Sequence, residues 1–249
     1  MRLAVIAVVI AAATTLFAEP VHAQSALKGA YVKLDTGWSW ANDAGMTDDQ
    51  SSSPNCVLQP ATGTVCNGTL NTLGSSFIIG AGVGYKLPMG FRVDLTYNNR
   101  SGYNLKGSDA AGTDFDPKVN SNAVLFNGYY DIPYTIAGRV KPFVGGGIGW
   151  VKNKMNNLQW NDPAPPASSG GLPGGTWSGT AWQLTIGADV NVTGNWVVEV
   201  GYRYVDLGKI VKEAGPSTSG SAFNANNYTT SMTGKLRANE FLLNFRYDL

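Results

Sequence analysis

The stretch KLRANEFLLNFRYDL, residues 235–249, ends the chain and alternates in character from one residue to the next. Apolar Phe241 and Leu243 share one parity, whereas Glu240 and Arg246 share the other. Because successive side chains of a β-strand point to opposite faces, this stretch predicts a strand with one apolar face and one charged face. A transmembrane β-barrel needs such a strand to close its wall.

Seven further segments alternate in the same way. The clearest is 182–192, in which Trp182 and Leu184 alternate with Gln183 and Thr185 over eleven residues. In the fourth segment Leu125 interrupts the polar parity, so the sequence fixes its register less strongly. With the C-terminal stretch, the predicted strands are 29–40, 75–87, 91–100, 122–132, 138–152, 182–192, 195–207 and 235–249.

The connections between these segments alternate in length. Three are short, at 88–90, 133–137 and 193–194. Four are long, at 41–74, 101–121, 153–179 and 208–234. Short periplasmic turns and long external loops are typical of outer-membrane barrels. The sequence therefore predicts an all-β fold: an eight-stranded antiparallel up-and-down transmembrane β-barrel with four long extracellular loops and both termini in the periplasm.

The N-terminus has the features of an export signal. Arg2 provides a positive start, residues 3–17 are mostly apolar, and Val21-His22-Ala23 fits a small-x-small cleavage site. We expect residues 1–23 to be a cleaved secretory signal peptide and residues 24–249 to form one outer-membrane barrel domain. An uncleaved anchor is the alternative, but a spanning helix needs about 20 apolar residues.

Composition narrows the functions. Charged residues make up 14% of the chain, against about 25% in soluble proteins, and the net charge of +1 argues against a nucleic-acid partner. Removing residues 1–23 removes His22, the only histidine. Enzymes on such barrels generally use a histidine base, so we expect no enzymatic activity, no cofactor and no metal.

The two cysteines, Cys56 and Cys66, fall in the first long loop of an exported chain. This context predicts a local disulfide, with free thiols as the alternative. Zinc would need more ligands than two thiols without a nearby histidine.

Three of the segments resemble a known family. The stretches Lys141–Gly149 (KPFVGGGIG), Trp182–Val190 (WQLTIGADV) and Glu199–Gly208 (EVGYRYVDLG) resemble the later strands of the small OmpA-type, opacity-protein-like barrels of Gram-negative bacteria. The resemblance implies a place in the cell outer membrane, with membrane lipid, lipopolysaccharide and the barrel assembly machinery as partners. It also implies a C-terminal assembly signal at Phe245, Tyr247 and Leu249, where the family usually ends in Phe.

The inward parity of the predicted strands carries equal numbers of acids and bases. Charges in a narrow, largely dry lumen must be paired, and eight strands leave room for little more than side chains. We therefore expect a lumen plugged by ion pairs, with a charged conduction path as the alternative. The fourteen members are Lys33, Asp35, Lys86, Arg92, Asp94, Asp131, Arg139, Lys141, Asp189, Glu199, Arg203, Glu240, Arg246 and Asp248. Partners of Glu199 and Arg203 must come from neighbouring strands, and Lys212 is expected to be an exposed loop charge.

Aromatic residues near the strand ends predict interfacial girdles rather than ligand stacks. These residues are Trp38, Trp40, Tyr85, Trp150, Trp182, Trp196 and Tyr204.

The main functional hypothesis is a structural barrel that supports the envelope and presents a cell surface. One alternative is a loop-based receptor or adhesin for haem or a host surface, although haem usually takes a histidine ligand. Another is a small-solute porin. Candidate recognition residues in the loops are Tyr103, Trp160, Trp177, Phe223 and Tyr228.

Overall fold

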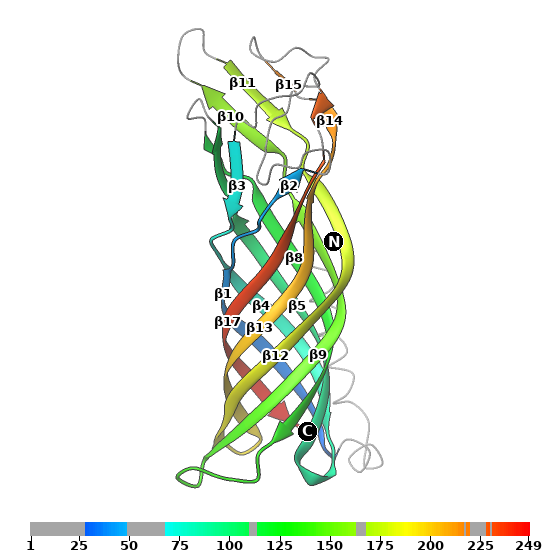
Figure 1. The fold of residues 1–249 in the computed structure, drawn as a ribbon. Helices are drawn as coiled ribbons and strands as arrows, with labels where there is room; N and C mark the ends of the chain where they lie inside the picture. Colours follow the sequence, from blue (N-terminus) through cyan, green and yellow to red (C-terminus); the bar gives the residue numbers. More distant parts are fainter. Residues whose placement is uncertain are drawn as a thin grey trace, which may run out of the picture.

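Eight long antiparallel strands form the body of the protein in a computed structural model (Figure 1). The structure describes residues 28–48, 68–109, 114–162, 168–216, 218–219, 228–229 and 231–249. The eight strands are β1 (Ala30–Ala41), β4 (Ser75–Lys86), β5 (Phe91–Asn104), β8 (Lys118–Asp131), β9 (Val140–Met155), β12 (Gly175–Thr193), β13 (Trp196–Lys212) and β17 (Met232–Asp248).

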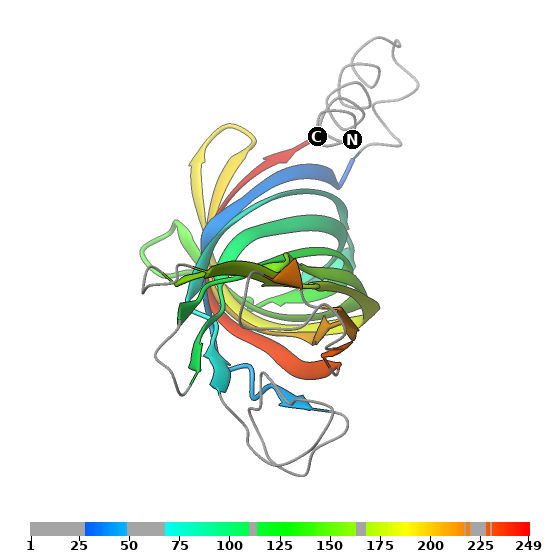
Figure 2. The same cartoon turned by 90° about the horizontal axis from the view of Figure 1, so that it is seen from above.

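These strands close into a barrel. Each pairs antiparallel with its neighbours in chain order, and β17 returns to pair with β1 along its length, from Tyr31 opposite Asp248 to Ala41 opposite Ala238. Viewed along its axis, the wall forms a ring (Figure 2). Closure gives every strand two partners and leaves no exposed edge in the wall. The predicted eight-stranded up-and-down barrel is confirmed.

The three predicted short turns all lie at one end of the barrel, the lower end in Figure 1. The first is the 3-10 turn η1 (Pro88–Gly90), in which Met89 and Gly90 have positive φ angles of 63° and 83°. The second joins β8 to β9 through 132–139, and the third joins β12 to β13 through 194–195. We call this the turn end and the opposite end the loop end.

Short strands rise beyond the barrel at the loop end (Figure 1). They form three small sheets and one extension of the wall. These strands are β2 (Thr47–Asp48), β3 (Gly68–Thr72), β6 (Lys106–Asp109), β7 (Asp114–Phe115), β10 (Leu158–Asp162), β11 (Ser168–Leu172), β14 (Gly215–Pro216), β15 (Thr218–Ser219) and β16 (Tyr228–Thr229).

The wall strands extend further toward the loops than the sequence predicts. Strand β12 begins at Gly175 rather than 182, and β13 ends at Lys212 rather than 207. The alternation continues there, but its sign changes: Val205 and Leu207 face inward while Asp206 faces outward. The prediction of where the strands end was wrong because polar side chains were expected to face only the lumen.

Within the described ranges, no helix is long and apolar enough to cross a membrane. The predicted signal peptide at residues 1–23, the predicted disulfide between Cys56 and Cys66, and Phe223 lie outside the described residues.

Candidate functional site

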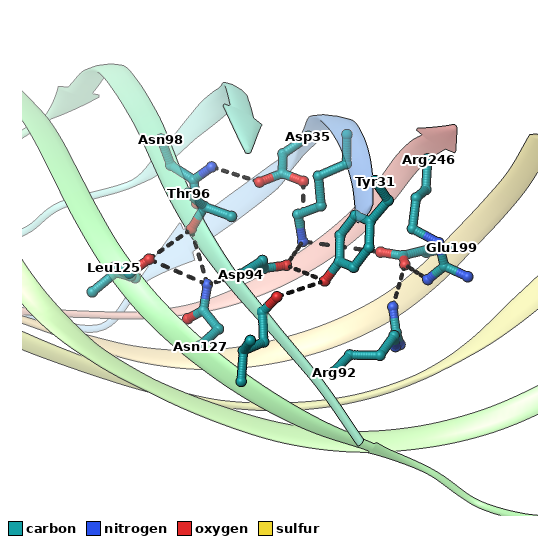
Figure 3. Close-up of polar contacts among 12 residues, drawn as sticks. Tyr31, Asp35, Arg92, Asp94, Thr96, Asn98, Leu125, Asn127, Glu199 and Arg246 are labelled. Atoms are coloured by element: carbon teal, nitrogen blue, oxygen red, sulfur yellow. Dashed lines mark hydrogen bonds and ion pairs between the residues drawn. The ribbon is translucent and has the colours of Figure 1, made fainter. Parts of the chain in front are cut away.

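The turn-end part and the middle of the barrel interior are filled by buried charges. Five basic and five acidic side chains are buried there, each with an exposed fraction of at most 6%. They come from β1, β5, β12, β13 and β17, so the cluster links strands on opposite sides of the wall. Figure 3 shows part of it. We call these ten residues the charged section: Lys33, Asp35, Arg92, Asp94, Arg100, Asp189, Glu199, Arg203, Glu240 and Arg246.

Basic side chains from three strands converge on the carboxylate of Glu199. Arg92 Nη1 lies 2.7 Å from Glu199 Oε1, and Arg246 Nη1 contacts the same oxygen. Lys33 Nζ lies 4.0 Å from the other carboxylate oxygen. Arg246 also reaches Asp189 on β12, with Nη2 2.9 Å from Oδ2. A carboxylate shared among several cations has its charge compensated without water.

Asp94 forms a second centre on the opposite wall. It accepts hydrogen bonds from the Tyr31 hydroxyl at 3.2 Å and from Asn127 Nδ2 at 2.7 Å, and Lys33 Nζ lies 3.0 Å away. The Asp94 carboxylate is therefore stabilised by two neutral hydrogen-bond donors, Tyr31 and Asn127, in addition to the charge of Lys33. Figure 3 shows these groups turned toward the same point of the lumen.

Nearer the loop end, Glu240 lies between two arginines. Arg100 donates to it through Nε at 2.6 Å and Nη2 at 3.1 Å, and Arg203 Nε lies 2.5 Å from Oε2. Arg203 Nη1 also donates to Asn98 Oδ1 at 3.0 Å, and Asn98 Nδ2 donates to Asp35 at 2.8 Å. The expectation that Glu199 and Arg203 find partners on neighbouring strands is confirmed for β17, which supplies Arg246 and Glu240. Their other partners reach across the lumen from β5 and β1, which do not adjoin β13.

At the turn end the predicted charges are less buried. Lys86 pairs with Asp248 at 2.5 Å, and Arg92 Nε reaches Asp131 at 2.8 Å. Arg139 and Lys141 are exposed, and no described ion pair includes either of them. Their assignment to the buried network was wrong, because they lie at the rim beside the 132–139 turn, where water solvates them.

Two buried charges, Arg100 and Lys212, differ from the sequence prediction. Arg100 is fully buried against Glu240, and its parity with Arg92 was the signal that could have identified it. Lys212 was expected to be an exposed loop charge, but it is fully buried at the end of β13. The Gly208 bulge, with a φ of 75°, shifts the register so that Ile210 and Lys212 face inward.

Above the charged section, the interior becomes apolar. One cluster of buried side chains includes Leu125, Val205, Leu207, Ile210 and Leu236, and residues from the loop-end segments pack on it. We call this cluster the apolar section. Its remaining members are Ala44, Met46, Leu73, Tyr103, Leu105, Val119, Ala123, Val151, Met155, Leu158, Leu172, Ala181, Met232 and Ala238.

Two residues that were predicted to be ligand-recognition residues of the loops belong to the apolar section or pack against it. Tyr103 is fully buried on β5, where its hydroxyl lies 2.5 Å from that of Ser39, and Trp177 packs against the cluster from β12. These two recognition assignments were wrong, because both residues lie on extended wall strands. The backbones of Trp160 and Tyr228 lie on loop-end strands.

Inward aromatic rings fill the space above lumen glycines. A Cβ atom on Gly145 would lie 2.2 Å from Tyr129 Cδ1, and one on Gly84 would lie 2.3 Å from Tyr31 Cζ. The Arg92 guanidinium in turn lies 5.1 Å from the centre of the Tyr129 ring. Glycine at these strand positions therefore leaves room for the rings.

The predicted girdle aromatics lie on the outward face and form two levels. Trp196 stacks edge-on against Tyr247 at 4.9 Å near the turn end, where Tyr85 also lies. Trp182 packs on Tyr204 at 5.6 Å near the loop end, the level of Trp38, Trp40 and Trp150. Between the levels the outward side chains are apolar and exposed, among them Leu34, Ile79, Ile148, Leu184 and Ile186. A membrane-facing surface has this arrangement.

Nothing in the described part of the chain groups three or more His, Cys, Asp or Glu side chains as metal ligands. The buried acids are instead matched with bases. These ion pairs link the strands of the wall across the lumen and fill its interior.

Comparison with known proteins agrees with this geometry. The model of the outer membrane protein beta-barrel domain family matches residues 9–248, so the chain belongs to that family and its place is the outer membrane.

The chain is 24% identical over 241 residues to the outer membrane protein PagN of Salmonella typhimurium, covering 90% of this chain and 91% of PagN. It is 28% identical over 172 residues to the putative adhesin RP828 of Rickettsia prowazekii, covering 62% of this chain and 72% of that protein. These two relatives are named as an outer membrane protein and a putative adhesin, and neither name is that of an enzyme.

Among solved structures, the outer membrane protein OprG from Pseudomonas aeruginosa superposes with a TM-score of 0.50 at 12% identity, over 89% of this chain and 97% of OprG. At this identity the likeness supports the fold alone.

Proposed function

We propose that this protein is a non-conducting barrel that anchors in the outer membrane, keeps both termini in the periplasm and presents its four loops on the cell surface. The main observation behind this proposal is that both the charged section and the apolar section fill the lumen. Ions or solutes would have to displace both the charged section and the apolar section, which lie one after the other along the same path. This argues against the porin alternative.

Planar-bilayer recording of the folded protein tests this proposal. We expect no stable, reproducible channel from the unmodified chain. A weakened charged section alone, as in Arg203→Ala, should leave the bilayer sealed because the apolar section remains. Frequent openings of the unmodified protein, with a uniform conductance, would make the porin function correct.

A second candidate function is adhesion through the loop end. It is favoured by the wall strands that continue past the outer aromatic level, since these lift the loop-end strands β10 and β11 away from the membrane (Figure 1). It is also favoured by relatives whose names are putative adhesins. The test is binding of cells that display the chain to host surfaces, compared with a variant in which 156–174 and 213–231 are replaced by short turns. Unchanged binding after replacement of all four loops would exclude the adhesion function.

The proposal also includes a cleaved signal peptide, a C-terminal assembly signal and a disulfide bond in the first loop. Residues 1–23 would be removed on secretion, the assembly machinery would read Phe245, Tyr247 and Leu249, and Cys56 would be joined to Cys66 outside the cell. Mass spectrometry of protein from intact cells tests cleavage and disulfide together. An N-terminus at Met1, or two free thiols, would contradict the respective part.

A further inference from the structure

Five lysines stand out on the outer wall at the loop end. Lys118 on β8, Lys152 and Lys154 on β9, Lys209 on β13 and Lys235 on β17 are all exposed. We call them the outer lysine group. None of the described ion pairs includes any of them, in contrast to Arg237 nearby, which pairs with Asp206 at 2.8 Å.

The register brings these like charges together. Lys154 is opposite Asn120, which places Lys118 diagonally across from it, and Lys152 lies two positions along the same face. Lys209 is directly opposite Lys235. Like charges directly across a strand pair destabilise it, and diagonal neighbours about 7–8 Å apart are within reach of long side chains. The wall therefore holds clustered ammonium groups that would be stabilised by an anion from outside.

The surface around the lysines also offers hydroxyl groups. Between the two lysine clusters, β12 exposes Thr176, Ser178 and Thr180. Of the nearby acids, Asp206 is held by Arg237, and Glu213 Oε1 accepts a long hydrogen bond of 3.4 Å from the Thr176 amide. Two more acids are exposed: Asp116, two residues before Lys118, and Asp43, beside the segment that pairs with Lys235. Lysines and hydroxyls together suit a phosphorylated, hydroxyl-rich head group.

The height of the group above the membrane surface also fits such a ligand. Lys152 follows Trp150, a residue of the outer aromatic level, by two positions, which is about 7 Å along the strand. Aromatic girdles mark the level of the lipid head groups, and basic side chains just beyond them attract anionic lipid.

We infer that the outer lysine group binds the phosphate groups of the phosphorylated glycolipid in the outer leaflet, lipopolysaccharide, and clasps it to the β8–β17 side of the wall. The ligand is bound from the side, by the outer surface of the wall, and not by the loops. The inference rests on the proposed orientation, in which the loop end is the extracellular end.

Titration of the full-length folded protein in neutral detergent with short-chain lipopolysaccharide, followed by native mass spectrometry, tests the inference. The variant is Lys118→Gln/Lys152→Gln/Lys154→Gln. The control is Lys28→Gln/Arg139→Gln/Lys141→Gln, which removes three exposed positive charges from the turn end. We expect the first variant to lose about tenfold or more in affinity, since each basic side chain near an anionic surface contributes. The control should bind like the unmodified protein.

Enzymatically dephosphorylated lipopolysaccharide provides the second arm. It should bind the unmodified protein as weakly as the intact glycolipid binds the loop-end variant. Equal binding of the phosphorylated and dephosphorylated forms would overturn the inference, as would equal losses in the variant and the control.

Orientation is measured separately, so that its failure is recognised. Ser178→Cys in a Cys56→Ser/Cys66→Ser background is exposed beside Lys152. Labelling of intact cells by a membrane-impermeant maleimide supports the extracellular placement. Labelling only after the outer membrane is opened would overturn the proposed orientation and, with it, this inference. Labelling without phosphate-dependent binding would overturn the inference alone.

Discussion

The charged section and the apolar section occupy the same lumen, on the same strands, and are stabilised by opposite means. On β17, Glu240 and Arg246 fill the first with ion pairs, while Leu236 and Ala238 fill the second by burial. Ion pairs buried among strands are costly to break but contribute little net stability once desolvation is counted. Buried apolar contacts contribute in proportion to the area removed from water. The two sections should therefore respond differently to the same kind of mutation.

The largest expected effect is in the charged section. Glu240→Ala leaves Arg100 and Arg203 buried without their shared carboxylate, and should lower the free energy of unfolding by about 3–5 kcal/mol. Urea unfolding of protein folded into lipid vesicles, followed by tryptophan fluorescence, measures this loss.

A matched control and a rescue sharpen that result. Asp206→Ala breaks the partly exposed pair with Arg237 and a hydrogen bond from the Gly208 amide, and it should cost far less than Glu240→Ala because water screens and replaces these contacts. Replacing Glu240, Arg100 and Arg203 together by Leu, Met and Met should recover most of the stability, because no charge is left unpaired. Equal losses for Glu240→Ala and Asp206→Ala would show that the buried triad is solvated.

A smaller loss is expected in the apolar section. Leu125 is fully buried where the two sections meet, and Leu125→Ala should cost about 2–4 kcal/mol through lost burial and the cavity left behind. The same urea titration applies, and Leu125→Met should cost less than about 1.5 kcal/mol because volume is conserved. If Leu125→Ala were neutral, the apolar section would not be close-packed.

The smallest effect tests the glycines beneath the aromatic rings. Gly145→Ala places a methyl group against Tyr129 and should cost about 1–3 kcal/mol through overpacking. Gly128 is its control, since a Cβ there meets nothing within 4 Å on the outward face, so Gly128→Ala should be neutral or slightly stabilising. Comparable losses at both positions would point to backbone effects rather than to ring packing.

Much of the charged section could be predicted from the sequence. Inside the membrane, lipid forces apolar side chains outward, so the opposite parity of residues such as Glu199 and Arg203 fixes their inward position. Short turns and long loops then give strand order and direction. Which partners meet could not be predicted, because Glu240 and Arg100 lie far apart in sequence and their pairing depends on the stagger of the closed barrel.

The apolar section could not be predicted from the sequence, because the solvent outside the wall changes from lipid to water along each strand. Beyond the outer aromatic level, water replaces lipid outside the wall, so Lys209 faces outward and Ile210 inward. The side chains still alternate with a period of two, but the polar ones now face outward and the apolar ones inward. A prediction that expects polar side chains to face the lumen therefore ends the strand at that point. The Gly208 bulge adds a register shift that places Lys212 inside, and alternation alone does not reveal it.

The two aromatic levels also set how thick a bilayer the barrel can accept. From Trp196 to Tyr204 the β13 strand advances about 26 Å, which a strand tilt of 35–45° reduces to a height of about 20 Å. Lipid chains of ordinary length form a hydrocarbon layer of about 30 Å, so they would have to thin around this wall, at a cost that grows with each ångström of mismatch. The protein should therefore fold faster and more completely into short-chain vesicles than into long-chain ones, and should gather in thin patches of membrane.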